Sequence, residues 1–197
     1  MAKYQHWYIR GWVYEDVLGR NGAVTHKLIY RGEYYRAYGP KGSFLRRKLL
    51  ITVLLALIYG AYVGYSFRGP AGGRVFYAGA ESMLAIIPMM FQGMGVVSLW
   101  AAPEKMPFRN YYAGVLRTKV SSAATAVLLT ASGVGEAVFM LLHRGQSSIR
   151  WADEWIWLGG CLVCAAAGFC IFYTLHTLHF DILPGDIDTT TQRRHLK

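Results

Sequence analysis

The sequence has few charged residues, and acidic residues are the scarcest of them. Charged residues make up 16% of the 197-residue chain, with 11 Asp and Glu against 21 Lys and Arg. A soluble domain usually carries about 25% charged residues. The composition therefore disfavours an ordinary soluble protein and indicates a basic chain with much apolar surface.

Motifs that define common enzyme classes are also missing. The sequence contains no G-x-S-x-G, P-loop, H-E-x-x-H or dinucleotide-binding fingerprint. We therefore expect no cofactor, and we favour a non-enzymatic protein over an enzyme. Residues 1–48 are polar and basic, unlike a cleavable signal peptide. We expect the first apolar segment to act as an uncleaved insertion signal.

Cysteine is rare, and its placement argues against redox or metal chemistry. The three cysteines, Cys161, Cys164 and Cys170, all lie in the last apolar segment. Cys161 and Cys164 form a C-x-x-C pair, but a zinc site would need further ligands nearby. We interpret these thiols as small packing residues.

Long apolar runs are what the chain has instead. Four of them cover residues 49–67, 75–99, 120–142 and 155–173. A bilayer core about 30 Å thick needs about 20 helical residues, and helices satisfy their own backbone in lipid. The sequence predicts an all-α membrane protein: a four-helix transmembrane bundle at 49–175, between a head at 1–48 and a polar tail at 176–197.

The placement of the basic residues predicts the orientation. Seventeen Lys and Arg lie in the head, the connection after the second span and the tail, whereas the loops at 68–74 and 144–150 hold four. Because cytosolic segments are enriched in Lys and Arg, we expect both termini inside, in a bacterial inner or plasma membrane. Topology explains the charge, so we expect no nucleic-acid partner. Anionic lipid headgroups suit Arg46, Arg47 and Lys48.

The head is too aromatic for a disordered segment and contains a hairpin signal. Asn21-Gly22 favours a two-residue turn between strands at 7–18 and 23–38. That register would place Asp16 opposite Lys27 and Trp12 opposite Arg31. A lone hairpin is marginally stable, so it should lean on the membrane, the inner connection or a second copy. The expected interaction residues are Trp7, Tyr8, Trp12, Tyr34 and Tyr35.

Two acidic residues lie inside apolar spans, where each charge costs about 3 kcal/mol. Glu81 and Glu136 are each seven residues from an outer loop, which predicts the same depth of about 10 Å. Gln92 lies three turns beyond Glu81, and Pro88 between them can kink the helix. Two interpretations stay open: hydrogen-bonded glue between helices, or a carboxyl pair, with at least one proton at neutral pH, that binds protons or a cation.

Other polar candidates lie at the ends of the fourth span. Asp153 and Glu154 suit a helix N-terminus, or they extend an outer acidic vestibule. His176, His179 and Asp181 at the inner end could hold a metal ion, or simply favour the helix C-terminus.

Small residues form stripes that allow helices to approach closely, within the bundle or between copies. They are Gly60 and Gly64 in the first span and Gly160, Cys164 and Gly168 in the fourth. The favoured function is a non-enzymatic component that assembles with itself or other membrane proteins, with the hairpin as docking element. The alternative is a small, dimeric proton- or cation-linked transporter or channel that uses Glu81, Glu136 and Gln92.

The orientation can be tested by cysteine labelling in a background that lacks the native thiols. Because the basic segments should be cytosolic, an impermeant reagent outside the cell should label positions near Gly72 and Gln146. Positions near Lys41 and Lys105 should be protected until the membrane is opened. Labelling of Lys41 or Lys105 positions from outside would contradict the predicted topology.

Overall fold

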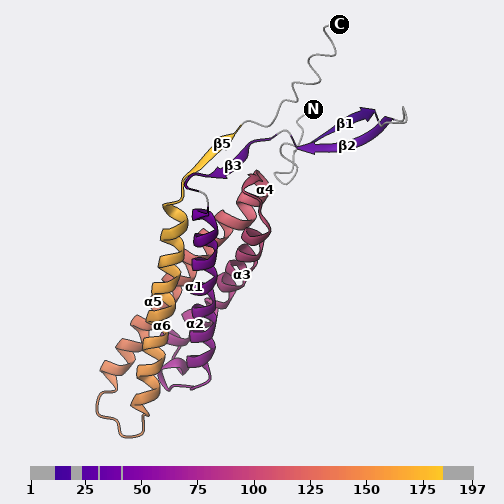
Figure 1. Cartoon of the computed structure of the whole chain (residues 1–197). Helices are drawn as coiled ribbons and strands as arrows, with labels where there is room; N and C mark the ends of the chain where they lie inside the picture. Colours follow the sequence, from indigo (N-terminus) through magenta and orange to yellow (C-terminus); the bar gives the residue numbers. More distant parts are fainter. Residues whose placement is uncertain (1–11, 19–23, 31, 41, 184–197) are drawn as a thin grey trace.

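The computed structural model describes residues 12–18, 24–30, 32–40 and 42–183. Over these residues the protein is mostly helical, and the helices form one elongated bundle with two small sheets at one end (Figure 1). We call that end the sheet end, and the opposite end, which holds the connections at 67–75 and 143–150, the loop end. Trp7 and Tyr8 lie outside the described residues.

Four helical segments are long and apolar enough to cross a membrane, as the sequence predicts. The first is α1 (Ser43–Ser66). The second combines α2 (Phe76–Leu84) and α3 (Ile86–Ala101), after the short 3-10 helix η2 (Gly72–Arg74). The third combines α4 (Phe108–Asn110), the π-helix η3 (Tyr111–Leu116) and α5 (Arg117–Leu142). The fourth is α6 (Trp151–His176). The helices extend past the apolar runs because their polar ends continue the same hydrogen bonding.

The second span is interrupted where the sequence predicts a kink. α2 ends at Leu84 and α3 begins at Ile86. Pro88 has no N–H to donate to the carbonyl of Leu84, and its ring crowds the preceding turn. Ala85 keeps right-handed helical angles and donates to the carbonyl of Glu81, so the chain follows a helical path through this one-residue interruption, and a kink at Pro88 stays a prediction.

Helix α5 is the centre of the bundle and packs against α6, α3 and α2. The buried positions on its inward face are alternately four and three residues apart, which is the spacing found where one helix packs along another. We call this row the α5 seam, and its buried residues are Thr118, Ser122, Thr125, Leu129, Ser132, Glu136 and Phe139. Next to the seam, Gly135 allows the backbone of Tyr77 in α2 to touch α5.

The N-terminal hairpin forms, but in a register one residue away from the predicted one. β1 (Trp12–Leu18) pairs antiparallel with β2 (Val24–Tyr30), with Trp12 opposite Tyr30. Asp16 therefore faces His26 rather than Lys27. The last pair, Leu18 and Val24, encloses an odd number of residues. The two-residue turn that we predicted would enclose an even number, and this difference accounts for the shift of one residue in the register.

The predicted second strand is divided, and this corrects the fold prediction. Its last part becomes β3 (Tyr34–Ala37), the middle strand of a second sheet with β4 (Lys105–Pro107) and β5 (Phe180–Leu183). Tyr34 and Tyr35 therefore belong to this sheet and not to the hairpin. The segment predicted only as a polar tail, 176–197, contributes β5. Both edges of β3 are covered, by the inner connection and by the tail, as a marginal strand requires.

Basic residues of α1 tie this sheet end together. Lys48 Nζ donates a hydrogen bond to the carbonyl of Ala102, at 3.0 Å, and Arg47 donates to the carbonyl of Thr174, at 3.2 Å. Carbonyls at helix C-termini lack partners within the helix and attract cations. Two of the three cations expected to face lipid headgroups thus bind the ends of α3 and α6 instead.

The close contact between α5 and α2 predicts that an added methyl group destabilises the protein at Gly135 but not at an exposed glycine. Gly135→Ala would press a methyl group against the backbone of Tyr77, whereas Gly159→Ala in α6 meets open space. We expect Gly135→Ala to lower the free energy of unfolding by on the order of 2 kcal/mol, and Gly159→Ala to be neutral or stabilising. Thermal unfolding in detergent measures both. Equal effects of the two substitutions would contradict the close helix contact.

Candidate functional site

Glu136, on the inward face of α5, has the most unusual surroundings of any acidic residue in the described structure. The residue has 0% exposure, and neither carboxyl oxygen accepts a hydrogen bond from an N–H or hydroxyl group among the described residues. Its carboxyl group lies directly against Gly72, where any side chain would collide with it. The absence of a side chain at Gly72 therefore lets η2 close over the Glu136 carboxyl.

Glu154, from the first turn of α6, lies beside the same glycine and next to Glu136. Its carboxylate accepts hydrogen bonds from the backbone N–H groups of Ala71, at 2.8 Å, and Gly72, at 3.2 Å. Glu154 is 1% exposed and is the electrostatic neighbour of Glu136. The partner of Glu136 is therefore Glu154, an acid that the sequence placed at a helix start, and not Glu81.

Glu81 and Glu136 lie at different levels along the bundle, and the reason is geometric. Ser132 Oγ donates a hydrogen bond to the carbonyl of Ala78, at 2.7 Å, so these residues are at the same level. Because α2 and α5 run in opposite directions, Glu81 lies three residues to one side of this level and Glu136 four to the other. At 1.5 Å per residue the two acids are offset by about 10 Å along the bundle. Glu81 and Glu136 therefore do not lie at the same depth, because equal residue counts from the two outer loops do not mean that α2 and α5 begin and end at the same level.

Gln92 belongs to a separate polar contact nearer the sheet end. The residue is fully buried, and its Nε2 donates to Ser122 Oγ at 2.9 Å. Ser122 is fourteen residues from Glu136 on α5, about 21 Å along the axis. Glu81, Glu136 and Gln92 therefore do not form one cluster. Glu81 is half-buried, with its Oε2 atom buried and unbonded among the described residues.

A polar cleft of about 360 Å³ opens beside Glu154 at the loop end. Asp153, 5% exposed, forms ion pairs with Arg150, at 3.2 Å, and Arg68, at 4.0 Å. The third arginine on the cleft is Arg74. The cleft thus has a basic rim and an acidic floor, and Glu136 lies immediately beneath that floor.

Polar side chains continue from Glu136 along the α5 seam, and the sequence analysis did not identify them. Ser132 also accepts a weak hydrogen bond from the Cys161 thiol, at 3.7 Å. Thr125 Oγ1 is buried without a hydrogen-bond partner among the described residues. Leu129, fully buried, separates Ser132 from Thr125. The alternating four- and three-residue spacing was the sequence signal that could have revealed this row.

The remaining candidates do not gather into sites. Among the described residues, no group of three or more His, Cys, Asp or Glu side chains could hold a metal ion. His176 stacks on Phe172, and Asp181 lies in β5 opposite Arg36. Cys164 donates to the carbonyl of Ile58, in keeping with the packing interpretation of the thiols.

Tyr30, Tyr34 and Tyr35 of the head have partners within the protein. The ring of Tyr35 stacks on Tyr111, with ring centres 4.4 Å apart, and its hydroxyl donates to Glu33. Tyr34 packs edge-on against Tyr30 and under the ammonium group of Lys105. Tyr35 therefore joins the sheet to the start of the third span, and Tyr34 packs between the end of β2 and β4.

Comparison with other proteins gives no assignment. No family model, no curated protein and no solved structure matches this chain. Four apolar helices are compatible with a multi-pass membrane protein, and any more specific function has to be argued from the geometry.

Proposed function

We propose that the protein is a small proton-linked membrane transporter in which Glu136 and Glu154 form the proton-binding site. The observation that carries this proposal is the Glu136 carboxyl group, which is fully buried and whose hydrogen-bonding neighbour among the described residues is a second buried acid, Glu154. Acids that only hold helices together are hydrogen-bonded to their neighbours. The neighbour that Glu136 bonds is a second acid, and two acids in contact share a proton, which favours a functional carboxyl group.

The neighbouring acid supports proton binding. Two carboxyl groups in contact in an apolar interior avoid carrying two negative charges by sharing a proton. The backbone bonds from Ala71 and Gly72 hold the Glu154 carboxylate in place, and Glu136 is left to take up or release the proton. The cleft that is lined by Glu154, Asp153 and three arginines supplies a route for exchange with water at the loop end.

Transport also requires access from the sheet end. Ser132, Thr125 and the Gln92–Ser122 pair extend polar groups in that direction, with Leu129 as the apolar block between them. The break between α2 and α3 provides a place where one half of the second span can move relative to the other. Four spans alone make a small transporter, so we expect two copies to work together.

Proton flux into liposomes tests this function. Purified protein is reconstituted with an internal pH dye, and a potassium gradient with valinomycin drives proton entry. We expect Glu136→Gln to abolish the protein-dependent flux, because the amide keeps the size of the side chain and removes its titration. Glu81→Gln is the matched control, because it alters the other intramembrane acid, about 10 Å away along the bundle, and should keep the flux.

Infrared spectroscopy of the same variants measures the protonation of the carboxyl groups directly, independently of proton flux. The wild type and Glu81→Gln should show a protonated-carboxyl band at neutral pH that Glu136→Gln lacks. Flux that is equal in all three proteins, or a band that survives Glu136→Gln, would contradict the proposal.

A second candidate function, a component of a membrane assembly, is favoured by a different observation. Gly60 and Gly64 lie on one face of α1, and a side chain at either position would meet open space. Such a flat face allows a second helix to approach closely. The β1–β2 hairpin also lies beyond the end of the bundle and has no third strand among the described residues (Figure 1).

Light scattering after gel filtration in mild detergent tests assembly through α1. We expect the wild type to form dimers or larger species, and Gly60→Leu with Gly64→Leu to give monomers, because bulky side chains separate the helices. Gly159→Leu on α6 also points into open space and is the control that should leave the assembly intact. A monomeric wild type would count against this function.

A further inference from the structure

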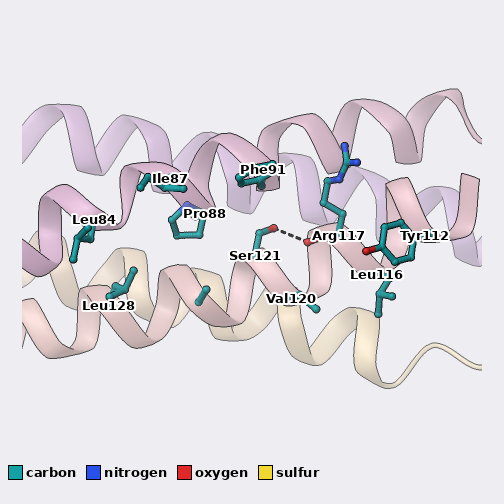
Figure 2. Close-up of a pocket in the computed structure, with 11 residues that line it drawn as sticks. Leu84, Ile87, Pro88, Phe91, Tyr112, Leu116, Arg117, Val120, Ser121 and Leu128 are labelled. Carbon is teal, nitrogen blue, oxygen red and sulfur yellow. Dashed lines mark hydrogen bonds between the residues drawn. The ribbon is translucent and has the colours of Figure 1, made fainter. Parts of the chain in front are cut away.

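An apolar groove of about 770 Å³ runs along the outside of the bundle between the second and third spans. Figure 2 shows Tyr112 and Arg117 at one end and Leu84 and Leu128 at the other. Ile87, Pro88 and Phe91 line one wall, and Val120, Ala124 and Leu128 line the other. The groove is therefore a hollow in a membrane-facing surface, with its charged residue at the sheet end.

The shape of the groove follows from features of both walls. The break at Ala85 and the ring of Pro88 interrupt the regular surface of the second span. On the opposite wall, Ser121 and Ala124 are small. The Ser121 hydroxyl already donates to the carbonyls of Arg117 and Thr118, so it adds no unsatisfied polar group to the groove.

Arg117 indicates which kind of molecule could bind in the groove. It is half-buried at the start of α5, and its guanidinium makes no ion pair or side-chain hydrogen bond among the described residues. A cation beside an apolar groove at the edge of a membrane is stabilised by an anion. A guanidinium group matches the oxygens of a phosphate with two parallel hydrogen bonds.

The length of the groove fits one leaflet of a bilayer. Arg117 and Leu128 are eleven residues apart on α5, or about 16 Å at 1.5 Å per residue. Half of a hydrocarbon core is about 15 Å. The groove therefore reaches from the level of the headgroups to the middle of the membrane, the span of a single acyl chain.

We propose that this groove binds one anionic phospholipid, with its phosphate on Arg117 and one acyl chain between α3 and α5. If the orientation predicted from the basic residues holds, the lipid comes from the cytosolic leaflet, which attracts basic segments through its negative surface. The inference is independent of the proposed transport function, because the groove and the Glu136 site are lined by different residues.

Native mass spectrometry of the full chain in detergent, with added phosphatidylglycerol or phosphatidylcholine, tests the site. We expect the wild type to retain one phosphatidylglycerol molecule more tightly than phosphatidylcholine. Arg117→Gln should weaken phosphatidylglycerol binding about tenfold, the effect of losing one charge-assisted hydrogen bond. Lys119→Gln is the matched control, because Lys119 lies over the ring of Phe172, away from the groove, and should leave binding unchanged.

A second pair of variants tests the acyl chain. Ala124→Trp fills the groove and should abolish tight binding, whereas Val127→Trp adds the same bulk at an exposed position outside it. Equal losses with Arg117→Gln and Lys119→Gln would mean general charge attraction and overturn the proposal. Lipid binding that survives Ala124→Trp would overturn the acyl-chain placement. A lipid-free dimer that Ala124→Trp dissociates would assign the groove to a second copy instead.

Discussion

The structure depends on one constraint: polar groups in an apolar interior need partners from within the protein. Most of the buried polar groups in the described chain meet it across helices. Ser132 binds the backbone of α2, Lys48 binds the end of α3, and Gln92 binds Ser122. Against that background Glu136 is conspicuous, because no N–H or hydroxyl group of the described residues reaches its carboxyl oxygens and its bonding neighbour is another acid, Glu154. The unusual chemistry of the protein is concentrated where this constraint is not met.

The two ends of the bundle differ in construction. At the sheet end, β3, β4 and β5 join segments from three parts of the chain, and Arg47 and Lys48 bind helix ends. At the loop end, short connections enclose a cleft with a basic rim, and the acids beneath it are held by a few backbone N–H groups. The sheet end is thus joined by strand pairing and cations on helix ends, and the loop end by two acids that bind backbone N–H groups and arginines.

Features that depend on local composition could be predicted from the sequence. Features that depend on the pairing register of strands, or on how far one helix is shifted along another, could not. Apolar runs gave the four spans, and Pro88 lies close to the interruption of the second. The partner of Glu136 could not be inferred, because residue counts from the loops do not say how two helices are offset. The second sheet was missed since its strands have three or four residues each, too short for an alternating pattern. Glu154 looked like an ordinary helix-start acid because the backbone that it binds is more than eighty residues away.

The second sheet has a consequence for how the chain is made. Its strands are contributed by residues 34–37, 105–107 and 180–183, so one arrives before the first span, one between the second and third, and one after the fourth. During translation, β3 can meet β4 as soon as two spans have been inserted. The other edge of β3 is covered only when the ribosome has passed residue 183. The sheet therefore closes only after the last of the four helices has been synthesised, so its closure links the segment before α1 to the completion of the bundle.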